Sequence, residues 1–176
     1  MNKTTTFIGR KITLRALEPE DLELLYTIEN DVSLWHVGSS NVPYSRYALK
    51  QFIAQNTNDV FADRQIRLMI EKNNTRQAVG MIDFMDFNAR HHRAEIGIII
   101  AKEYQQKGYG TEALELIEDY ACQIPQVHQL YAYVSIHNQP SEKLFRQAGY
   151  EHTCTLKKWV WEDGAYSDVM VFQKFL

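Results

Sequence analysis

Residues 104–111 read Tyr-Gln-Gln-Lys-Gly-Tyr-Gly-Thr, and this stretch decides the fold that the sequence predicts. It follows an apolar run over residues 96–101 and precedes a strongly helical pattern over residues 112–124. A strand, a glycine-bearing turn and a helix in this order point backbone N–H groups at an anion. Gly108 and Gly110 carry no Cβ, so a ligand can approach the main chain closely, and the preceding lysine adds a positive charge. The stretch therefore predicts a pyrophosphate site.

The spacing of the glycines distinguishes between the phosphate-binding turns. A dinucleotide-binding fingerprint needs a third Gly or Ala, and Ala113 fits only the looser form of that pattern. A P-loop places its lysine after the glycine, whereas Lys107 precedes Gly108. Residues 105–110 instead match the pattern Gln/Arg-x-x-Gly-x-Gly/Ala. A glycine-containing loop that merely caps the following helix is the alternative.

This pattern and the segments around it resemble the GNAT family of N-acetyltransferases, in which it is the acetyl-CoA pyrophosphate motif. Residues 93–100 resemble the fourth strand of that family. Residues 138–150 resemble its second motif, an Asn at a strand end followed by a helix that closes at Gly-Tyr. The resemblance covers nearly the whole chain and is nearest to the spermidine and ribosomal-protein N-acetyltransferase branch. It implies a mixed α/β fold with a mostly antiparallel sheet, splayed between its fourth and fifth strands, and helices on both faces.

Bulk properties agree with a globular protein of one domain over residues 1–176. The chain has 45% apolar and 23% charged residues and a net charge of −3, so no polybasic surface indicates nucleic acid. Its apolar runs are shorter than a membrane span, and the first residues lack a signal-peptide core, which favours a cytoplasmic location. No metal site is predicted, and association into homo-oligomers stays open.

Periodicity predicts the individual elements. A helix is expected to start near Pro19 and another after a Ser45 cap, and further helices are expected over residues 112–124 and 139–148. Strands are expected over residues 11–16, 66–71, 78–87, 93–100, 130–136, 151–161 and 165–175. In the last hairpin, Trp159 and Trp161 alternate in a way that usually indicates packing, although relatives place this hairpin beside the acceptor site.

The resemblance also implies which residues hold acetyl-CoA as co-substrate. The main chain of the fourth strand would pair with the pantetheine arm, the glycine turn would hold the pyrophosphate, and the motif Asn would bond the arm or a water. These cofactor-binding residues are Ile98, Ile99, Ile100, Gln105, Gln106, Lys107, Gly108, Tyr109, Gly110, Thr111, Asn138 and Phe145. For Asn138, capping of the strand end is the alternative.

Glu95 is the candidate general base. An amine of pKa about 10 must lose a proton before it attacks the thioester, so a base is needed. Glu95 lies in an otherwise apolar stretch, where burial would raise its pKa toward a useful value, and family members often use a Glu there. A structural ion pair with Arg93 is the alternative.

The general acid has several candidates. The spermidine branch has a tyrosine seven residues after the motif Asn, and this chain has Phe145 at that position. Phe145 is expected to face the acetyl-CoA sulfur but cannot donate a proton. Ser141 resembles the serine of the ribosomal-protein branch, with a plain helix-start residue as the alternative. Tyr131 or Tyr133 could reach in, or the thiolate could leave unassisted.

The acceptor is a small-molecule or peptide amine that the sequence leaves open. The loop over residues 33–43 contains no acid, which weakens a polyamine assignment, and Trp35 and His36 suit a less charged amine equally well. A peptide N-terminus, an aminoglycoside-like amine or an amino sugar are alternatives to spermidine. A non-catalytic acyl-CoA binder is the alternative of another class, favoured by Phe145 and disfavoured by Glu95.

Overall fold

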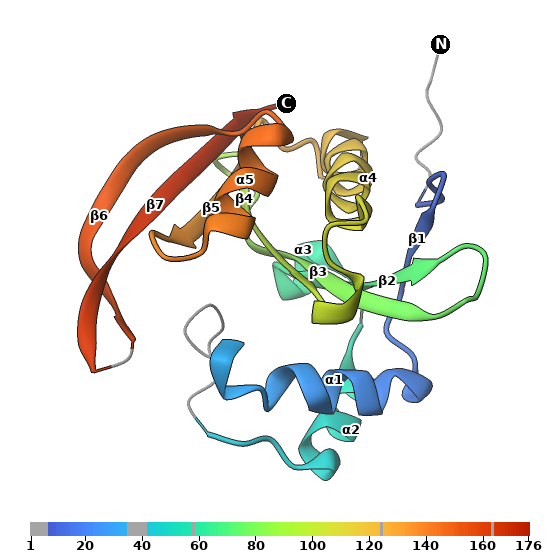
Figure 1. Cartoon of the computed structure of the whole chain (residues 1–176). Helices are drawn as coiled ribbons and strands as arrows, with labels where there is room; N and C mark the ends of the chain where they lie inside the picture. Colours follow the sequence, from blue (N-terminus) through green and yellow to red (C-terminus); the bar gives the residue numbers. More distant parts are fainter. Residues whose placement is uncertain (1–6, 35–41, 58, 124, 163) are drawn as a thin grey trace.

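The computed structural model describes residues 7–34, 42–57, 59–123, 125–162 and 164–176 (Figure 1). The strands are β1 (Ile12–Arg15), β2 (Ile66–Lys72), β3 (Ala78–Asn88), β4 (Arg93–Ile100), β5 (Gln129–Ser135), β6 (Glu151–Glu162) and β7 (Ala165–Phe175). The α-helices are α1 (Leu22–Glu29), α2 (Arg46–Gln55), α3 (Val60–Asp63), α4 (Tyr109–Gln123) and α5 (Gln139–Gln147). Short 3₁₀ helices are η1 (Pro19–Asp21), η2 (Val32–Leu34) and η3 (Lys102–Tyr104).

The strands form one seven-stranded sheet in the order β1-β2-β3-β4-β5-β7-β6. Among the described strands, β4 and β5 make the one parallel pair, and the other neighbours are antiparallel. The β4–β5 register joins residues 93–95 to residues 129–131 and then stops, so the two strands diverge beyond Glu95. The predicted mixed sheet with a splay between its fourth and fifth strands is confirmed.

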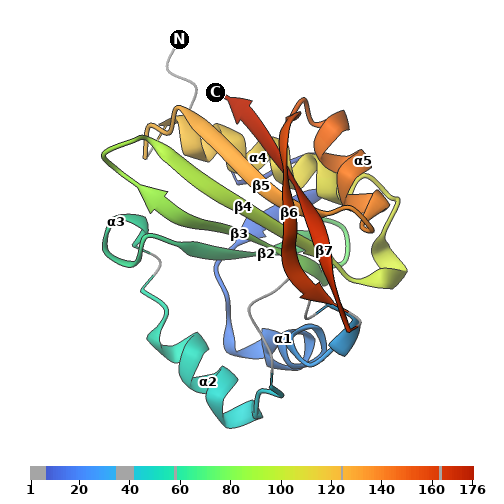
Figure 2. The same cartoon turned by 90° about the vertical axis from the view of Figure 1, so that its left-hand side faces the viewer.

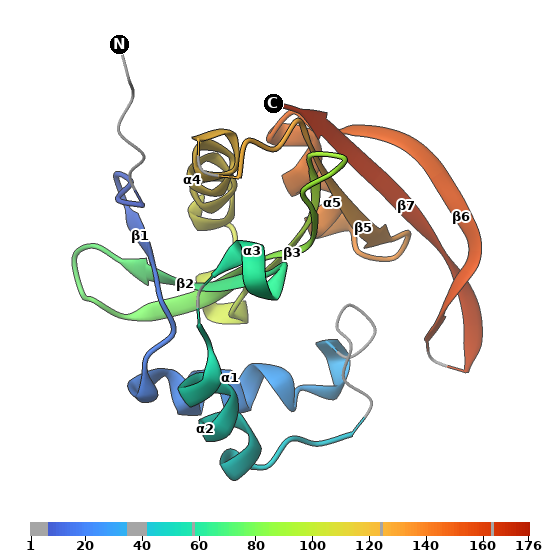
Figure 3. The same ribbon diagram turned by 180° about the vertical axis from the view of Figure 1, so that it is seen from behind.

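Helices cover both faces of the sheet, α4 and α5 on one and α1 and α2 on the other (Figures 1 and 3). Alternate residues of a strand point to opposite faces, and the two cores divide accordingly. Ile82 joins the core beneath α4, whereas its neighbour Met81 joins the core with Leu25 of α1 and Leu49 of α2. The helices thus pack where the period-two pattern of the strands requires.

Helix starts follow the sequence with one difference. Ser45 caps α2 as predicted, since its Oγ accepts a hydrogen bond from the Ala48 N–H at 3.1 Å. The helix after the glycine turn begins at Tyr109 instead of Glu112. The reason is that the Gly108 carbonyl already accepts the Glu112 N–H at 3.2 Å, so the helix begins inside the glycine motif.

The β6–β7 hairpin forms as predicted, but its aromatic residues do not pack in the core. Trp159 and Trp161 are 59% and 63% exposed, so the expectation of packing was wrong. The β6–β7 register shifts between Leu156 and Val160, where Lys158 has a φ of 52°. Such a bulge bends a strand, and the end of the hairpin lies on the same side of the sheet as α1 (Figure 2).

Candidate active site

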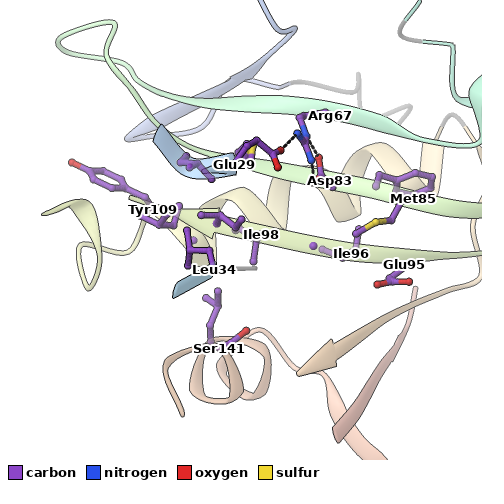
Figure 4. A pocket seen from close by; sticks show the side chains of 18 of the residues that line it. Glu29, Leu34, Arg67, Asp83, Met85, Glu95, Ile96, Ile98, Tyr109 and Ser141 are labelled. Carbon is purple, nitrogen blue, oxygen red and sulfur yellow. Dashed lines mark hydrogen bonds and ion pairs between the residues drawn. The ribbon is translucent and has the colours of Figure 1, made fainter. Parts of the chain in front are cut away.

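A cleft with a volume of about 1590 Å³ opens where β4 and β5 diverge (Figure 4). We call its two parts the α4–α5 end and the α1–α2 end. The α4–α5 end is lined by residues 97–100 of β4 and by residues 104–106, 108–111, 138–141, 143–145 and 147. The α1–α2 end is lined by side chains of α1, α2, β2 and β3, and Glu95 lies between the two parts.

The predicted pyrophosphate loop lines the α4–α5 end. Gln106 and Gly108 adopt left-handed conformations with φ of 59° and 83°. The loop is tied to its own strand, because the Gln105 side-chain amide donates to the Ile100 carbonyl at 3.0 Å. The Lys107 ammonium donates to the Glu103 carbonyl at 2.7 Å. The first N–H groups of α4 have no partner within the helix, so they are available to an anion at this position.

The two glycines of the loop are needed for different reasons. Gly108 has a positive φ, and a Cβ there would lie 3.2 Å from the Lys11 ammonium nitrogen. A Cβ on Gly110 would instead lie 3.2 Å from Leu144 Cδ2 and 3.8 Å from Ile100 Cγ1. Gly110 therefore lets α4 pack closely against α5, a role that differs from the expected close approach of a ligand.

The end of β4 presents an open edge to the cleft. Ile98, Ile99 and Ile100 line the cleft and pair with β3 along one edge only, within the described strands. Their side chains are half-buried, with Ile98 and Ile100 against the α4 core and Ile99 against the α1 core. The opposite backbone edge can therefore accept an extended ligand as an added strand.

Glu95 lies at the last position of β4 that pairs with β5, opposite Tyr131 on β5 and Met85 on β3. Its side chain lines the cleft and points into it (Figure 4). Burial, together with the negative charge of nearby Asp86, raises the pKa of Glu95 to about 7. A carboxyl group with that pKa can take up a proton near neutral pH, as a general base must.

Asp86 is a functional candidate that the sequence reasoning missed. It lies at a bulge between Met85 and Asn88 with a φ of 48°. Its Oδ2 accepts a hydrogen bond from the Tyr131 hydroxyl at 2.5 Å. Burial and this hydrogen bond raise the pKa of Tyr131, so that hydroxyl stays protonated. An acid inside a bulge interrupts the strand pattern at Met85–Asn88, and that interruption is the one signal the sequence carried.

Helix α5 brings three predicted residues to the cleft. The Asn138 side-chain oxygen accepts the Ser141 N–H at 3.1 Å, so Asn138 caps the start of α5, whereas the alternative reading had it cap the strand end. Ser141 is half-buried and faces the cleft (Figure 4). Phe145 also lines the cleft but is only 2% exposed, with its ring 5.0 Å from Tyr150 and 6.2 Å from Phe172.

The tyrosines of β5 differ in their relation to the cleft. Tyr133 is 45% exposed and lines the cleft, whereas Tyr131 makes a hydrogen bond to Asp86. The two rings lie 5.7 Å apart in an edge-to-face arrangement. Burial, and then the charge of Glu95, raises the pKa of Tyr133, so this hydroxyl is also protonated near neutral pH.

The α1–α2 end is built from a charged network of α1, β2 and β3. The Arg67 guanidinium donates to Glu29 at 2.6 Å and to both oxygens of Asp83 at 2.7 and 2.8 Å (Figure 4). Burial lowers the pKa of Arg67, but the two carboxylates outweigh it and raise that pKa above its ordinary value. No role was assigned to Glu29 from the sequence. Trp35 and His36 lie outside the described residues.

Two further properties concern the described residues as a whole. Within the described ranges, no group of three or more His, Cys, Asp or Glu side chains is arranged to hold a metal ion. None of the described helices combines the length and apolar character that crossing a bilayer requires.

Known proteins resemble this chain in sequence and in fold. A spermidine N(1)-acetyltransferase of Vibrio cholerae is 26% identical over 165 residues, which cover 92% of this chain and 91% of that protein. A spermidine N(1)-acetyltransferase of Escherichia coli K12 is 28% identical over 143 residues, which cover 81% of this chain and 74% of that protein. The structure of a Vibrio cholerae spermidine N-acetyltransferase in complex with CoA and spermine has the same fold, with a TM-score of 0.85 at 24% identity. That likeness covers 95% of this chain and 96% of the other.

The family assignment rests on a match that spans most of the chain. The model of the acetyltransferase (GNAT) domain matches residues 11–151, which include the open edge of β4, the glycine loop and helix α5. The resemblance seen in the sequence is therefore confirmed. This chain belongs to the GNAT family, and it is an acetyl-CoA-dependent N-acetyltransferase.

Proposed function

We propose that the protein transfers the acetyl group of acetyl-CoA to a primary amine of a cationic small molecule, a polyamine such as spermidine, by direct attack. The observation that carries this proposal is the charge of the α1–α2 end. Arg67 is shared by Glu29 and Asp83, so the three groups together keep a net negative charge, and Asp63 adds another carboxylate to the lining. An ammonium group at a distance from the reacting amine finds favourable partners there.

This charge answers the objection that the loop over residues 33–43 contains no acid. The carboxylates of the α1–α2 end come from α1, α3 and β3, not from that loop. The Vibrio cholerae and Escherichia coli relatives described above are named spermidine N(1)-acetyltransferase, which supports the same class of acceptor. A peptide N-terminus carries its neighbouring charges in no fixed pattern and would use this network less well.

Acetyl-CoA fits the α4–α5 end in one orientation. The pyrophosphate would lie on residues 105–111, where the positive end of α4 and Lys107 favour an anion. The pantetheine arm would lie along the main chain of residues 98–100, the open edge of β4. The thioester would then lie between Glu95 and α5, and Asn138 and Phe145 would border the arm at the start and middle of that helix.

The chemical step then needs one base and one acid. Glu95 takes the proton from the acceptor ammonium, directly or through a water, and the free amine attacks the carbonyl carbon of the thioester. The amine nitrogen first bonds to the carbonyl carbon, and backbone N–H groups of β4 would stabilise the oxyanion that results. The C–S bond breaks as this intermediate collapses. Ser141 faces the cleft at the start of α5, and it would give a proton to the departing thiolate and regain one that the nitrogen loses as it becomes an amide.

A panel of amines tests the proposal, with release of CoA thiol as the measurement. Spermidine, spermine, a free peptide N-terminus, an aminoglycoside and an amino sugar would be compared at fixed acetyl-CoA. We expect the highest kcat/KM for the polyamines, because they carry a second cation on a flexible chain that can extend into the α1–α2 end. A higher kcat/KM for the peptide would contradict the acceptor class.

A variant sharpens the same test. Asp83→Asn removes one carboxylate of the network, so we expect a KM for spermidine that is roughly 10-fold higher with little change for a monoamine. Glu23→Gln is the matched control, because Glu23 pairs with Arg46 on the exposed surface at 2.8 Å and does not line the cleft. Equal changes for spermidine and the monoamine would show that Asp83 does not read the second charge.

A further inference from the structure

A second pocket lies beside the glycine loop and is lined by different elements from the cleft. Its volume is about 320 Å³, at the lower end of the usual range for small-molecule sites. The pocket shares Tyr109 with the cleft. Its other lining residues are Arg10 and Lys11 before and at the start of β1, Asn73 and Asn74 in the β2–β3 turn, and Lys107 of the glycine loop.

The pocket gathers positive charge. Arg10, Lys11 and Lys107 all line it and are all exposed. Lys72 lies close to the same loop, since the Lys72 and Lys107 ammonium groups lie 5.6 and 5.2 Å from the centre of the Tyr104 ring. In the part of the chain that the structure describes, Arg10, Lys11 and Lys107 form no ion pair with a carboxylate. Like charges repel each other, so an anion in this pocket would be strongly favoured.

The walls of the pocket are fixed by hydrogen bonds of the Asn73 and Glu112 side chains. The Asn73 amide donates to the Gly9 carbonyl at 2.9 Å, and its oxygen accepts from Thr13 at 2.8 Å. The buried Glu112 carboxylate accepts the backbone N–H of Lys11 at 3.0 Å and also that of Arg10. The Glu112 carboxylate is therefore hydrogen-bonded to the main chain of Arg10 and Lys11 and not to their side chains.

One contact joins this pocket to the pyrophosphate loop. The Lys11 ammonium donates to the Lys107 carbonyl at 3.1 Å and lies 3.2 Å from the position that a Gly108 Cβ would take. An anion held by Lys11 would thus lie immediately beside a pyrophosphate on residues 105–111. In CoA the ribose joins the pyrophosphate to a 3′-phosphate monoester, so one ligand carries both groups a few bonds apart.

We propose that the pocket of Arg10, Lys11 and Lys107 binds a phosphate monoester, with the 3′-phosphate of acetyl-CoA as its first source and a separate phosphate ligand as the second. The inference rests on the proposed placement of the pyrophosphate on residues 105–111. A monoester dianion suits the site because it presents three oxygens to the three cationic side chains of the pocket. The pocket would make the enzyme distinguish acetyl-CoA from its 3′-dephospho form.

Calorimetric titration with acetyl-CoA and with 3′-dephospho-acetyl-CoA tests this. We expect the wild-type protein to bind acetyl-CoA at least roughly 10-fold more tightly than the dephospho form. Arg10→Gln should weaken acetyl-CoA binding several-fold and leave the dephospho form unchanged. Lys11→Gln should weaken acetyl-CoA binding at least as much, but it also removes the hydrogen bond to the Lys107 carbonyl of the glycine loop, so Arg10→Gln is the cleaner variant. Lys102→Gln on η3 is the control, since it removes the same charge outside the pocket.

The outcomes separate the two sources and the two proposals. A third titration, with inorganic phosphate monitored by ³¹P NMR, covers a separate ligand. Equal affinity for both cofactor forms, with saturable phosphate binding that Arg10→Gln abolishes, assigns the pocket to a separate phosphate. Equal affinities without phosphate binding overturn the inference. A wild-type protein that binds neither cofactor form overturns the pyrophosphate assignment instead, and the phosphate titration then decides on the pocket alone.

Discussion

The two ends of the cleft present different chemical groups to a ligand. The α4–α5 end presents main chain, namely the open edge of β4 and the first turn of α4, to a ligand that is the same throughout the family. The α1–α2 end presents charged side chains, with Arg67 between Glu29 and Asp83. Backbone groups recognise phosphates and extended chains, whereas side chains can be exchanged one by one. If acetyl-CoA and the acceptor bind as proposed, the α4–α5 end fixes the reaction and the α1–α2 end selects the acceptor.

The largest effect on acetyl-CoA binding is expected from Gly108→Val at the α4–α5 end. A Val at a φ of 83° is strained by roughly 1–2 kcal/mol and points toward the Lys11 ammonium beside the pyrophosphate loop. We expect calorimetric acetyl-CoA binding to be abolished. Gly164→Val is a matched control, because Gly164 has a φ of 79° with nothing within 4 Å of its Cβ position. Gly110→Val should lower both affinity and melting temperature, since its Cβ meets Leu144. Normal affinity in both loop variants would refute the loop as the pyrophosphate site.

Glu95→Gln tests the residue between the two ends. Because a positioned base typically contributes about 10²–10⁴-fold, we expect acetylation to fall by that factor with acetyl-CoA affinity unchanged. The wild-type rate should rise with pH through about 7, the pKa of Glu95, and the variant should lose this limb. Glu103→Gln, on the exposed turn before the loop, should keep it. A normal rate across pH in Glu95→Gln would make Glu95 structural.

The same variant has a readout that needs no substrate. The pKa of Glu95 is raised on folding from 4.5 to about 7, so the folded protein binds more protons than the unfolded chain between these values. Wild-type stability should therefore fall as pH rises through this window, and Glu95→Gln should remove that contribution. We expect the variant to have the higher melting temperature above pH 7. A lower melting temperature there would mean that the carboxylate stabilises the fold.

Arg67→Met tests whether the α1–α2 end is a stabilising network as well as a selective one. Removing the cation leaves Glu29 and Asp83 facing each other in a half-buried site, so we expect roughly 1–3 kcal/mol less free energy of unfolding. Arg46→Met is the control, because the Arg46–Glu23 pair is exposed and should contribute little to the free energy of unfolding. Urea unfolding of both variants measures the difference, and equal losses would show that the network has no special stability.

The smallest effect is expected on α5. Ser141→Ala should lower turnover roughly 10-fold, less than a typical acid, because a thiol of pKa about 8.5 leaves readily. Phe145→Tyr places a hydroxyl beside the cleft and should restore part of this rate in the double variant. Its own stability should fall, since Phe145 is 2% exposed against Tyr150 and Phe172. Turnover that stays unchanged in the single and double variants would leave release unassisted or assign the acid to Tyr133.

The sequence predicted the backbone of the α4–α5 end far better than the charged network of the α1–α2 end, for a physical reason. A backbone site depends on local geometry, and the spacing of Gly108 and Gly110 between a strand and a helix encodes that geometry within a few residues. The strands, the hairpin and the splay followed from periodicity and from the family resemblance, and they are confirmed. The start of α4 was misplaced because the helix begins inside the loop itself.

The charged network of the α1–α2 end was not predicted, because its residues are far apart in the sequence and come together only in the folded chain. Glu29, Arg67 and Asp83 lie on α1, β2 and β3, and Arg67 and Asp83 each resemble an ordinary surface residue in its own strand pattern. Asp86 approaches Glu95 through a bulge, which strict alternation cannot anticipate. The exposure of Trp159 and Trp161 follows from a second bulge in β6. Departures from regular strand geometry thus account for most of what the sequence did not show.

The divergence of β4 and β5 after three paired residues also affects how the molecule moves. Amides on the open edge of residues 97–100 have no strand partner on that side, so they should exchange their hydrogens with solvent readily until acetyl-CoA pairs with them. A ligand that completes a sheet also stabilises the fold by mass action, in proportion to the logarithm of its concentration over Kd. The abundance of acetyl-CoA would then set how rigid the centre of the sheet is, before any acceptor arrives.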